Sequence, residues 1–336
     1  MKKINIGIIG LGRIGKVHLE SLMYRLPKAN VVAAADINEK SHAFAKEIGV
    51  ERVFTDYKKI INHPDIQGLI ICSPTFTHFQ YIEEAAKAGK HIFCEKPLEL
   101  TIEKIKKIDA IIQKTDVKLQ VGFNRRFDAN FTKVKEMVSK GKIGEPHILK
   151  ITSRDPAPPP IEYIKGSGGM FLDMTIHDFD MARFVVGSEV TEVYAKGAVL
   201  VNQSIGEAGD IDTALITLTF ENGCIGIIDN SRKAVYGYDQ RIEIFGSKGM
   251  SQTGNNYHDS QILTDKQGSH AALPLDFFMD RYTEAYFREM QVFLEVIEKN
   301  KLSPVGSKDA LMATAIAIAA KKSIKENRTV LLKEIL

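Results

Sequence analysis

The stretch INIGIIGLGRIGKVHLESLMYRLPKANVVAAAD, residues 4–36, determines how the first part of the chain folds. It opens with an apolar run, Ile4–Ile9, which predicts a buried strand. The motif G-x-G-x-x-G follows at residues 10–15 and opens an amphipathic segment, Ile14–Tyr24, ahead of a second apolar run, Val31–Ala35. A strand, a glycine-rich turn, a helix and a second strand in this order predict a unit with parallel strands.

Short apolar runs continue to alternate with amphipathic segments as far as Phe123. This alternation predicts an α/β domain of the Rossmann type with a doubly wound parallel sheet, which we place at residues 1–123. The further strands are expected at Gly68–Ile71, His91–Phe93 and Lys118–Val121, and the further helices at Glu39–Ile48, His78–Ala88 and Ile102–Lys114.

The glycines of the motif have separate physical roles. Gly10 permits the tight turn, Gly12 lets the backbone approach a pyrophosphate, and Gly15 lets the helix pack closely on the strand. Asp36 ends the second strand, where a carboxylate binds ribose hydroxyls and repels a 2′-phosphate, so the predicted cofactor is NAD rather than NADP. The predicted cofactor-binding residues of this region are Gly10, Gly12, Arg13, Ile14, Gly15 and Asp36.

Composition excludes several classes of function. The chain has 336 residues, and its 45 basic and 42 acidic side chains leave a net charge of only +3, so no nucleic-acid partner or membrane surface is expected. Its three cysteines have no metal-like spacing, and we expect no metal site. The chain starts without a signal-peptide pattern, and its longest apolar helical stretch, Ala310–Ala320, is too short to cross a bilayer, so a cytoplasmic protein is expected.

The alternating pattern ends at about Phe127. We place a second domain at residues 124–336 and expect an α+β fold with a large, mostly antiparallel sheet. Alternating apolar and polar residues from Val190 to Leu263 indicate antiparallel strands, and Asn222-Gly223 predicts a two-residue hairpin between two of them. Helices on one face of this sheet are expected, with the last helix free to pack back on the first domain. The other predicted elements are a strand at Ile148–Ser153 and helices at Asn130–Ser139, Phe171–Val186, Tyr282–Glu298 and Ser307–Lys325, the last with Ser307 as N-cap.

Two loops of the first domain follow predicted strands and therefore face the crevice at the carboxyl edge of the sheet. Ser73-Pro74-Thr75, with His78 just after it, is interpreted as a cofactor contact. The alternative is that Ser73 and Thr77 cap the helix that starts near His78, and the two are compatible. Glu95-Lys96-Pro97 is the second loop. A lysine there is suited to hydrogen-bond a substrate oxygen, although a lysine taken alone is more often a surface charge.

Asp173 and His177 form the second chemical candidate. Their spacing places both on one face of the predicted helix Phe171–Val186, one turn apart. An aspartate suits the first turn of a helix, and the positive end of the helix dipole favours a neutral imidazole that accepts a proton. The alternative is a first-turn aspartate beside a half-buried histidine.

Taken together, G-x-G-x-x-G, Glu-Lys-Pro and Asp-x-x-x-His resemble the Gfo/Idh/MocA oxidoreductases over nearly the whole chain. The stretches at 122–128, 153–160, 168–181 and 277–286 are similar to the inositol dehydrogenases of that family. The resemblance implies NAD-dependent oxidation of a ring alcohol of a cyclic polyol, with myo-inositol as the first choice, and a homotetramer. It implies Lys96, Asp173 and His177 as catalytic residues, and Arg126, Asp155, Tyr236 and Tyr282 as contacts of the substrate or the nicotinamide; Ser73, Pro74, Thr75, His78 and Glu95 complete the expected cofactor site.

Two other functions stay open at this point. The first keeps fold and cofactor but changes the substrate to scyllo-inositol, another cyclic polyol or a glucose-like aldose. The second is a non-catalytic NAD(H) sensor on the same fold. Because Lys96, Asp173 and His177 are all present, the sequence favours an enzyme.

Overall fold

The computed structural model describes residues 3–336, which form two compact units. The first unit contains the chain up to Phe127 together with Glu284–Met312, and the second contains Asp128–Thr283 together with Ala313–Leu336. Assignment of residues 1–123 to the cofactor and 124–336 to the substrate stays a prediction. In residues 3–336, no helix has the length and apolar character needed to span a membrane.

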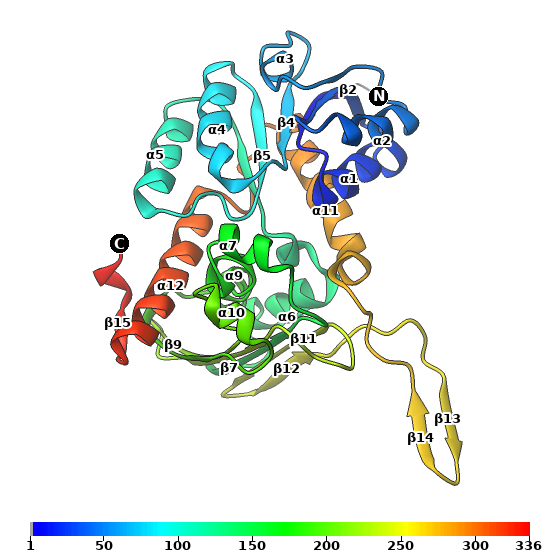
Figure 1. Ribbon diagram of the computed structural model, residues 1–336. Coiled ribbons are helices and arrows are strands. Elements are labelled where there is room, and N and C mark those ends of the chain that lie inside the picture. The colour runs from blue at the N-terminus through cyan, green and yellow to red at the C-terminus, as the bar shows by residue number, and fades with distance from the viewer. Residues whose placement is uncertain (1–2) are drawn as a thin grey trace. The chain divides into compact units, whose positions relative to one another are not determined.

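The first unit is built on a six-stranded parallel sheet with the order β3-β2-β1-β4-β5-β6 (Figure 1). The strand order reverses between β1 and β4, so the carboxyl ends of these two strands flank the crevice where ligands bind in such sheets. The predicted doubly wound sheet is confirmed. Its strands are β1 (Ile4–Ile9), β2 (Ala29–Ala35), β3 (Val53–Phe54), β4 (Gly68–Ile71), β5 (His91–Glu95) and β6 (Leu119–Gly122).

The helices of the first unit follow the predicted pattern with local differences. The predicted helix Ile14–Tyr24 is α1 only as far as Glu20, after which Ser21–Arg25 forms a π-helical turn. The predicted helix Glu39–Ile48 begins with a 3₁₀ turn, Glu39–Ser41. The helices are α1 (Arg13–Glu20), α2 (His42–Glu47), α3 (Lys58–Ile61), α4 (His78–Lys87) and α5 (Ile102–Gln113), with parts of α11 (Phe278–Glu298) and α12 (Ser307–Glu326).

The core of the first unit contains side chains from segments that are far apart in the sequence, β1 and β5 on one hand and α11 on the other. Ile6 and Ile8 of β1 and Phe93 of β5 are fully buried there, and Met290 and Phe293 of α11 belong to the same cluster. Burying large apolar side chains of this kind stabilises a fold by about 1.5–3 kcal/mol each. Helix α11 is therefore an integral part of the unit that carries the glycine motif.

The second unit is built on a seven-stranded sheet with the order β12-β11-β7-β10-β9-β8-β15. All neighbouring pairs are antiparallel except β7 and β10, which run parallel. The predicted hairpin at Asn222-Gly223 joins β9 to β10, but the prediction of a two-residue turn is wrong. Thr219 pairs with Ile225 and Phe220 N bonds to Cys224 O, so the loop is Glu221–Gly223, with Gly223 at a φ of +85°. The strands are β7 (Pro146–Arg154), β8 (Val190–Ala198), β9 (Thr213–Phe220), β10 (Ile225–Ser231), β11 (Asp239–Gly246), β12 (Gly249–Thr253) and β15 (Val330–Leu331).

Helices cover one face of this sheet, and a separate hairpin projects from it (Figure 1). The side chains of β9 alternate strictly between buried and more exposed positions, as predicted for a sheet with one covered face. The projecting hairpin consists of β13 (Ile262–Asp265) and β14 (Gly268–Ala271), whose residues are all exposed. The helices are α6 (Ala129–Ser139), α7 (Ile161–Ser167), α8 (Met170–Asp173), α9 (Ile176–Val186) and α10 (Gln203–Glu207).

The prediction of one continuous helix over Phe171–Val186 is wrong. The chain leaves the helical path between Asp173, which ends α8, and Ile176, which begins α9. The amide of Thr175 bonds back to Met170 O, and its buried hydroxyl donates to Asn230 Oδ1 at 2.6 Å. Because the backbone bond from Thr175 N to Met170 O spans five residues instead of four, the hydrogen-bond register of α8 does not continue into α9, a change that sequence spacing alone does not reveal.

The N-cap role expected for Ser307 is also wrong. The Ser307 hydroxyl donates to Asp109 Oδ1 of α5 at 2.5 Å and so ties two helices of the first unit together.

Candidate functional site

The glycine turn after β1 has the shape that a dinucleotide needs. Gly10 has a φ of +95°, and a Cβ there would lie 2.6 Å from the backbone of Cys72. A Cβ on Gly15 would lie 2.0 Å from Gly10 O, so α1 and the turn pack too closely for any side chain. By contrast, in residues 3–336 no atom lies within 4 Å of a Cβ placed on Gly12. This open side fits a pyrophosphate that approaches the backbone.

The amino end of α1 complements that open side. The helix begins at Arg13, directly after Gly12, and no side chain of the described residues caps it. Its first amides and the positive end of its dipole therefore suit the phosphates of NAD. The residues present fit the cofactor that the motif predicts.

Asp36 stands at the carboxyl end of β2 and is tied to the glycine turn. Its Oδ2 accepts a hydrogen bond from Leu11 N at 2.6 Å, and its Oδ1 accepts one from Asn38 N at 2.7 Å. The half-buried carboxylate is thus fixed in orientation, and its remaining lone pairs are suited to ribose hydroxyls.

Replacing Asp36 is expected to relax discrimination between NAD and NADP. Because a like-charge contact with a 2′-phosphate costs several kcal/mol, we expect Asp36→Ala to lower the ratio of kcat/KM for NAD over NADP by about tenfold or more. Asp36→Asn, which keeps the shape and an acceptor but removes the charge, should also improve use of NADP. Steady-state rates with both cofactors measure this effect. An unchanged ratio in both variants would show that another acid sets the preference.

The loop after β4 is held by its own side chains. The hydroxyls of Ser73 and Thr77 lie 2.6 Å apart, and no side chain caps α4, so the interpretation of these residues as helix caps is wrong. His78 is buried, with Nε2 2.9 Å from Ser73 O and Nδ1 3.0 Å from Pro97 O. Burial lowers its pKa. His78 thus links the Ser73 loop to the loop that contains Lys96.

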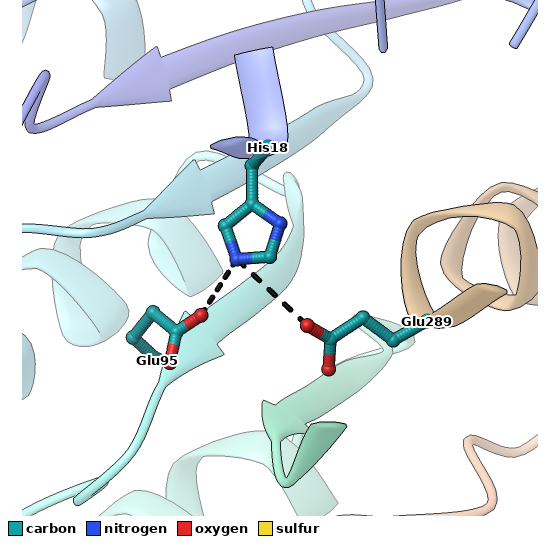
Figure 2. Close-up of side chains that lie close together, drawn as sticks. All are labelled: His18, Glu95 and Glu289. Atoms are coloured by element: carbon teal, nitrogen blue, oxygen red, sulfur yellow. Dashed lines mark hydrogen bonds and ion pairs between the residues drawn. The ribbon is translucent and has the colours of Figure 1, made fainter. Parts of the chain in front are cut away.

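Lys96 directly follows β5, at the carboxyl edge of the parallel sheet, and is half-buried. Its own amide donates to Glu95 Oε2 at 3.2 Å. Glu95 Oε1 lies 2.6 Å from Nε2 of the buried His18, and Glu289 of α11 lies nearby (Figure 2). Glu95 is predicted from the sequence as a cofactor contact, but its carboxylate bonds within this buried cluster.

Arg126 lies in the 3₁₀ turn Asn124–Phe127 after β6. Its guanidinium donates to Asp309 Oδ1 at 2.8 Å and to Pro304 O at 3.3 Å. The side chain is therefore anchored within the first unit, and its contact with substrate or nicotinamide stays a prediction.

In the second unit, Arg232 brings two predicted site residues together. Its Nη1 donates to Asp173 Oδ2 at 3.0 Å and lies 3.5 Å from Asp155 Oδ2. Asp155 follows β7 and Arg232 follows β10, so the parallel pairing of these strands places the two residues side by side. Burial opposes the charge of Arg232, but the carboxylates of Asp173 and Asp155 raise its pKa above the ordinary value.

Asp173 has a second partner, because Tyr163 donates its hydroxyl to Asp173 Oδ1 at 2.8 Å. Both oxygens of this carboxylate are therefore fixed. His177 lies in the first turn of α9 and is half-buried. Neither Arg232 nor Tyr163 was found from the sequence, because their relation to Asp173 depends on strand pairing and on a helix, α7, that follows a proline-rich loop.

The two predicted tyrosines lie in another hydrogen-bond network, around β11. Tyr236 donates to Asp239 Oδ2 at 2.7 Å and accepts from Arg154 at 2.9 Å. Tyr282 is only 2 % exposed and bonds to Gln240 Oε1 at 3.3 Å. Their contact with a substrate stays a prediction.

Known proteins resemble the chain over its whole length. Residues 4–123 match the model of the oxidoreductase family with an NAD-binding Rossmann fold, and residues 131–252 match the GFO/IDH/MocA C-terminal domain. Myo-inositol 2-dehydrogenase of Thermotoga maritima is 48% identical, over 99% of this chain and 100% of the relative. Inositol 2-dehydrogenase of Rhizobium meliloti is 46% identical, over 97% and 98%. The crystal structure of scyllo-inositol dehydrogenase from Lactobacillus casei, with bound NAD(H) and scyllo-inositol, superimposes with a TM-score of 0.93 at 34% identity, over 99% and 100%.

Proposed function

Because the chain belongs to the Gfo/Idh/MocA family of oxidoreductases, we propose that it is an NAD-dependent inositol 2-dehydrogenase. It oxidises a ring secondary alcohol of myo-inositol to the ketone. The observation that carries this proposal is the 48% identity, over the whole chain, to the myo-inositol 2-dehydrogenase of Thermotoga maritima. The glycine turn, with its open side at Gly12 and the fixed carboxylate of Asp36, supports NAD as the cofactor.

The proposed catalytic residues are Lys96, Asp173 and His177. Bound NAD supplies the acceptor for the hydride that leaves the carbinol carbon. His177 takes the hydroxyl proton as general base while the C–O bond becomes a double bond. Lys96 donates a hydrogen bond to the same oxygen and stabilises the negative charge that develops on it. Asp173, held by Arg232 and Tyr163, supplies the fixed carboxylate among the three proposed catalytic residues.

The remaining predicted contacts complete the proposal. Asp155 shares Arg232 with Asp173, so two carboxylates at one place offer acceptors for adjacent ring hydroxyls. We assign Arg126, Tyr236 and Tyr282 to the substrate or the nicotinamide end of NAD. Ser73, Pro74 and Thr75 are assigned to the walls of the cofactor site, and the buried side chains of His78 and Glu95 support its loops instead of contacting the cofactor.

A substrate panel tests the proposed activity. With NAD in excess, myo-inositol, scyllo-inositol and glucose are each supplied, and formation of NADH is followed by absorbance. We expect the highest kcat/KM with myo-inositol. Activity with glucose alone would replace inositol by an aldose as substrate, and tight NADH binding without turnover of any polyol would indicate a sensor.

Scyllo-inositol is the second candidate substrate. The scyllo-inositol dehydrogenase of Lactobacillus casei shares the fold over 99% of the present chain, at 34% sequence identity. The myo-inositol 2-dehydrogenase of Thermotoga maritima is 48% identical. The difference favours myo-inositol.

The uncovered face of the second sheet supports a homo-oligomer, which by resemblance is a tetramer. Neighbouring strands pair so that the exposed apolar side chains fall on one face. Exposed apolar side chains gathered on an uncovered sheet face are typical of a subunit interface, although Lys150 and Glu243 lie on the same face. Its residues are Ile148, Leu215, Ile225, Ile227, Phe245 and Met250.

Charges on this face are expected to dissociate the oligomer. We expect Ile225→Glu combined with Ile227→Glu to lower the mass in solution, because four or more carboxylates would meet at the interface. Light scattering after gel filtration measures the mass. Leu302→Glu, at an exposed leucine of the first unit, is the matched control. An unchanged mass in the double variant would place the interface elsewhere.

The cytoplasmic location and a role in inositol catabolism belong to the proposed function as well.

A further inference from the structure

Three ionisable side chains from distant parts of the sequence meet inside the first unit (Figure 2). His18 comes from α1, Glu95 from the end of β5 and Glu289 from α11. His18 and Glu289 are fully buried, and Glu95 is 7% exposed. Nε2 of His18 lies 2.6 Å from Glu95 Oε1 and 3.9 Å from Glu289 Oε1. Burying three such groups is costly, so the arrangement calls for a role beyond packing.

Glu289 is the member of this cluster whose carboxyl group is least supported by hydrogen bonds. Neither carboxylate oxygen has a hydrogen-bond partner in the part of the chain that the structure describes. Burial, followed by the nearby charge of Glu95, raises the pKa of Glu289 well above its ordinary value. This direction favours the protonated form of Glu289, which avoids two negative charges side by side in the cluster. Glu95 is left as the acceptor for His18.

The hydrogen bond between His18 and Glu95 has a fixed geometry. The imidazole packs edge-on against Phe93, with ring centroids 5.1 Å apart, and against Tyr286, at 5.7 Å. The Glu95 carboxylate fills the space that a side chain at position 122 would need. A Cβ on Gly122 would lie 2.8 Å from Glu95 Oε2. Neither partner has room to turn away.

The distances indicate a hydrogen bond rather than a metal site. Two ligands bound tetrahedrally at about 2.1 Å from one ion lie roughly 3.4 Å apart. The separation of 2.6 Å between His18 Nε2 and Glu95 Oε1 is much shorter and matches a charge-assisted hydrogen bond.

The cluster is connected directly to Lys96. Glu95 Oε2 accepts from the amide of Lys96, while Oε1 is held by His18. On the far side of the lysine, His78 lies 3.0 Å from Pro97 O. Two buried histidines thus fix the backbone on both sides of Lys96.

We infer that His18 is a positioning residue for Lys96, acting through the Glu95 carboxylate. This inference rests on the proposed catalytic role of Lys96. Because His18 stands one turn after Gly15 on α1, it also ties the helix that faces the cofactor phosphates to the loop that carries the lysine. The N–H of His18 thereby sets where the lysine lies relative to the cofactor.

The test compares two substitutions of His18. His18→Phe keeps an aromatic ring against Phe93 and Tyr286 but removes the donor to Glu95, whereas His18→Gln keeps an N–H at the end of a side chain of similar reach. A misplacement of about 1 Å costs up to about 100-fold in rate, so we expect His18→Phe to lower the single-turnover rate of hydride transfer by about 10- to 100-fold. The Kd for NADH and the KM for myo-inositol should stay within about threefold, and His18→Gln should recover most of the rate.

Further variants separate this inference from the proposed function. Lys96→Met should abolish turnover; wild-type turnover in it would overturn the role of the lysine itself. A wild-type rate in His18→Phe beside an inactive Lys96→Met would overturn the positioning role alone. Equal losses in His18→Phe and His18→Gln, or one equivalent of divalent metal in the purified protein, would overturn it as well. If His18→Phe does not fold, Gly122→Ala, which displaces Glu95 from the opposite side, must reproduce the loss of rate with NADH binding retained.

Discussion

Replacement of His177 with alanine is expected to lower turnover of myo-inositol by about 100- to 10,000-fold, the usual contribution of a general base. The proton of the reacting hydroxyl would have no acceptor, while the glycine turn and Asp36, which lie in the first unit, would be unchanged. Binding of NADH should therefore be retained. Stopped-flow absorbance of NADH measures the rate, and fluorescence titration measures the binding.

The matched control for this variant is His258→Ala, at an exposed histidine of the second unit. It removes an imidazole without touching the proposed site, and its turnover should equal that of the wild type. Near-normal turnover in His177→Ala would remove His177 from the mechanism and leave Lys96 or a water molecule as the proton acceptor.

Arg232→Met is expected to lower both stability and activity. Arg232 is 2% exposed and donates to Asp173 Oδ2, so its loss leaves a buried carboxylate without its cation. Breaking a buried pair from one side costs about 3–5 kcal/mol, and we expect the free energy of unfolding to fall by about that amount. Urea denaturation at neutral pH measures the loss, and kcat/KM for myo-inositol should fall with it because Asp173 loses its orientation.

A double variant distinguishes the charge effect from a packing effect. Arg232→Met combined with Asp173→Asn removes both charges and should recover part of the lost stability without restoring activity. Lys299→Met, which removes an exposed ion pair with Glu295, should leave stability almost unchanged. If the double variant is no more stable than Arg232→Met, the loss comes from packing of the arginine side chain and not from the unpaired carboxylate.

Local patterns explain why much of the first unit was predictable. The turn at Gly10 and the strand before it are set by residues close in sequence, so the β1–α1 segment was found from the motif alone. Strand β3, with only Val53 and Phe54, was too short to give a pattern. The π-helical turn after Glu20 has no distinct signature either, since Ser21–Arg25 continues the same amphipathic period.

The missing parts of the site depend on contacts between distant segments. Arg232 meets Asp155 because β7 and β10 pair in parallel, within a sheet that the sequence predicts only as mostly antiparallel. Glu289 meets His18 because α11 packs into the core of the first unit. This helix follows β1 by more than 200 residues in the sequence. Asp173 and His177 lie on two helices because the backbone register changes at Thr175, whose hydroxyl bonds to the distant Asn230. None of these contacts leaves a periodic signal.

Helix α11 also bears on the order of events during synthesis. Domains generally fold as the chain leaves the ribosome, from the amino end onward. Here the apolar cluster around β1 and β5 lacks Met290, Phe293 and Leu294 until more than 200 further residues have been translated after β1. The glycine turn and Asp36 are therefore translated early, whereas the helix that completes the core of their unit, α11, is translated much later. The unit that carries the glycine turn is completed by α11, a segment that emerges more than 200 residues after that turn.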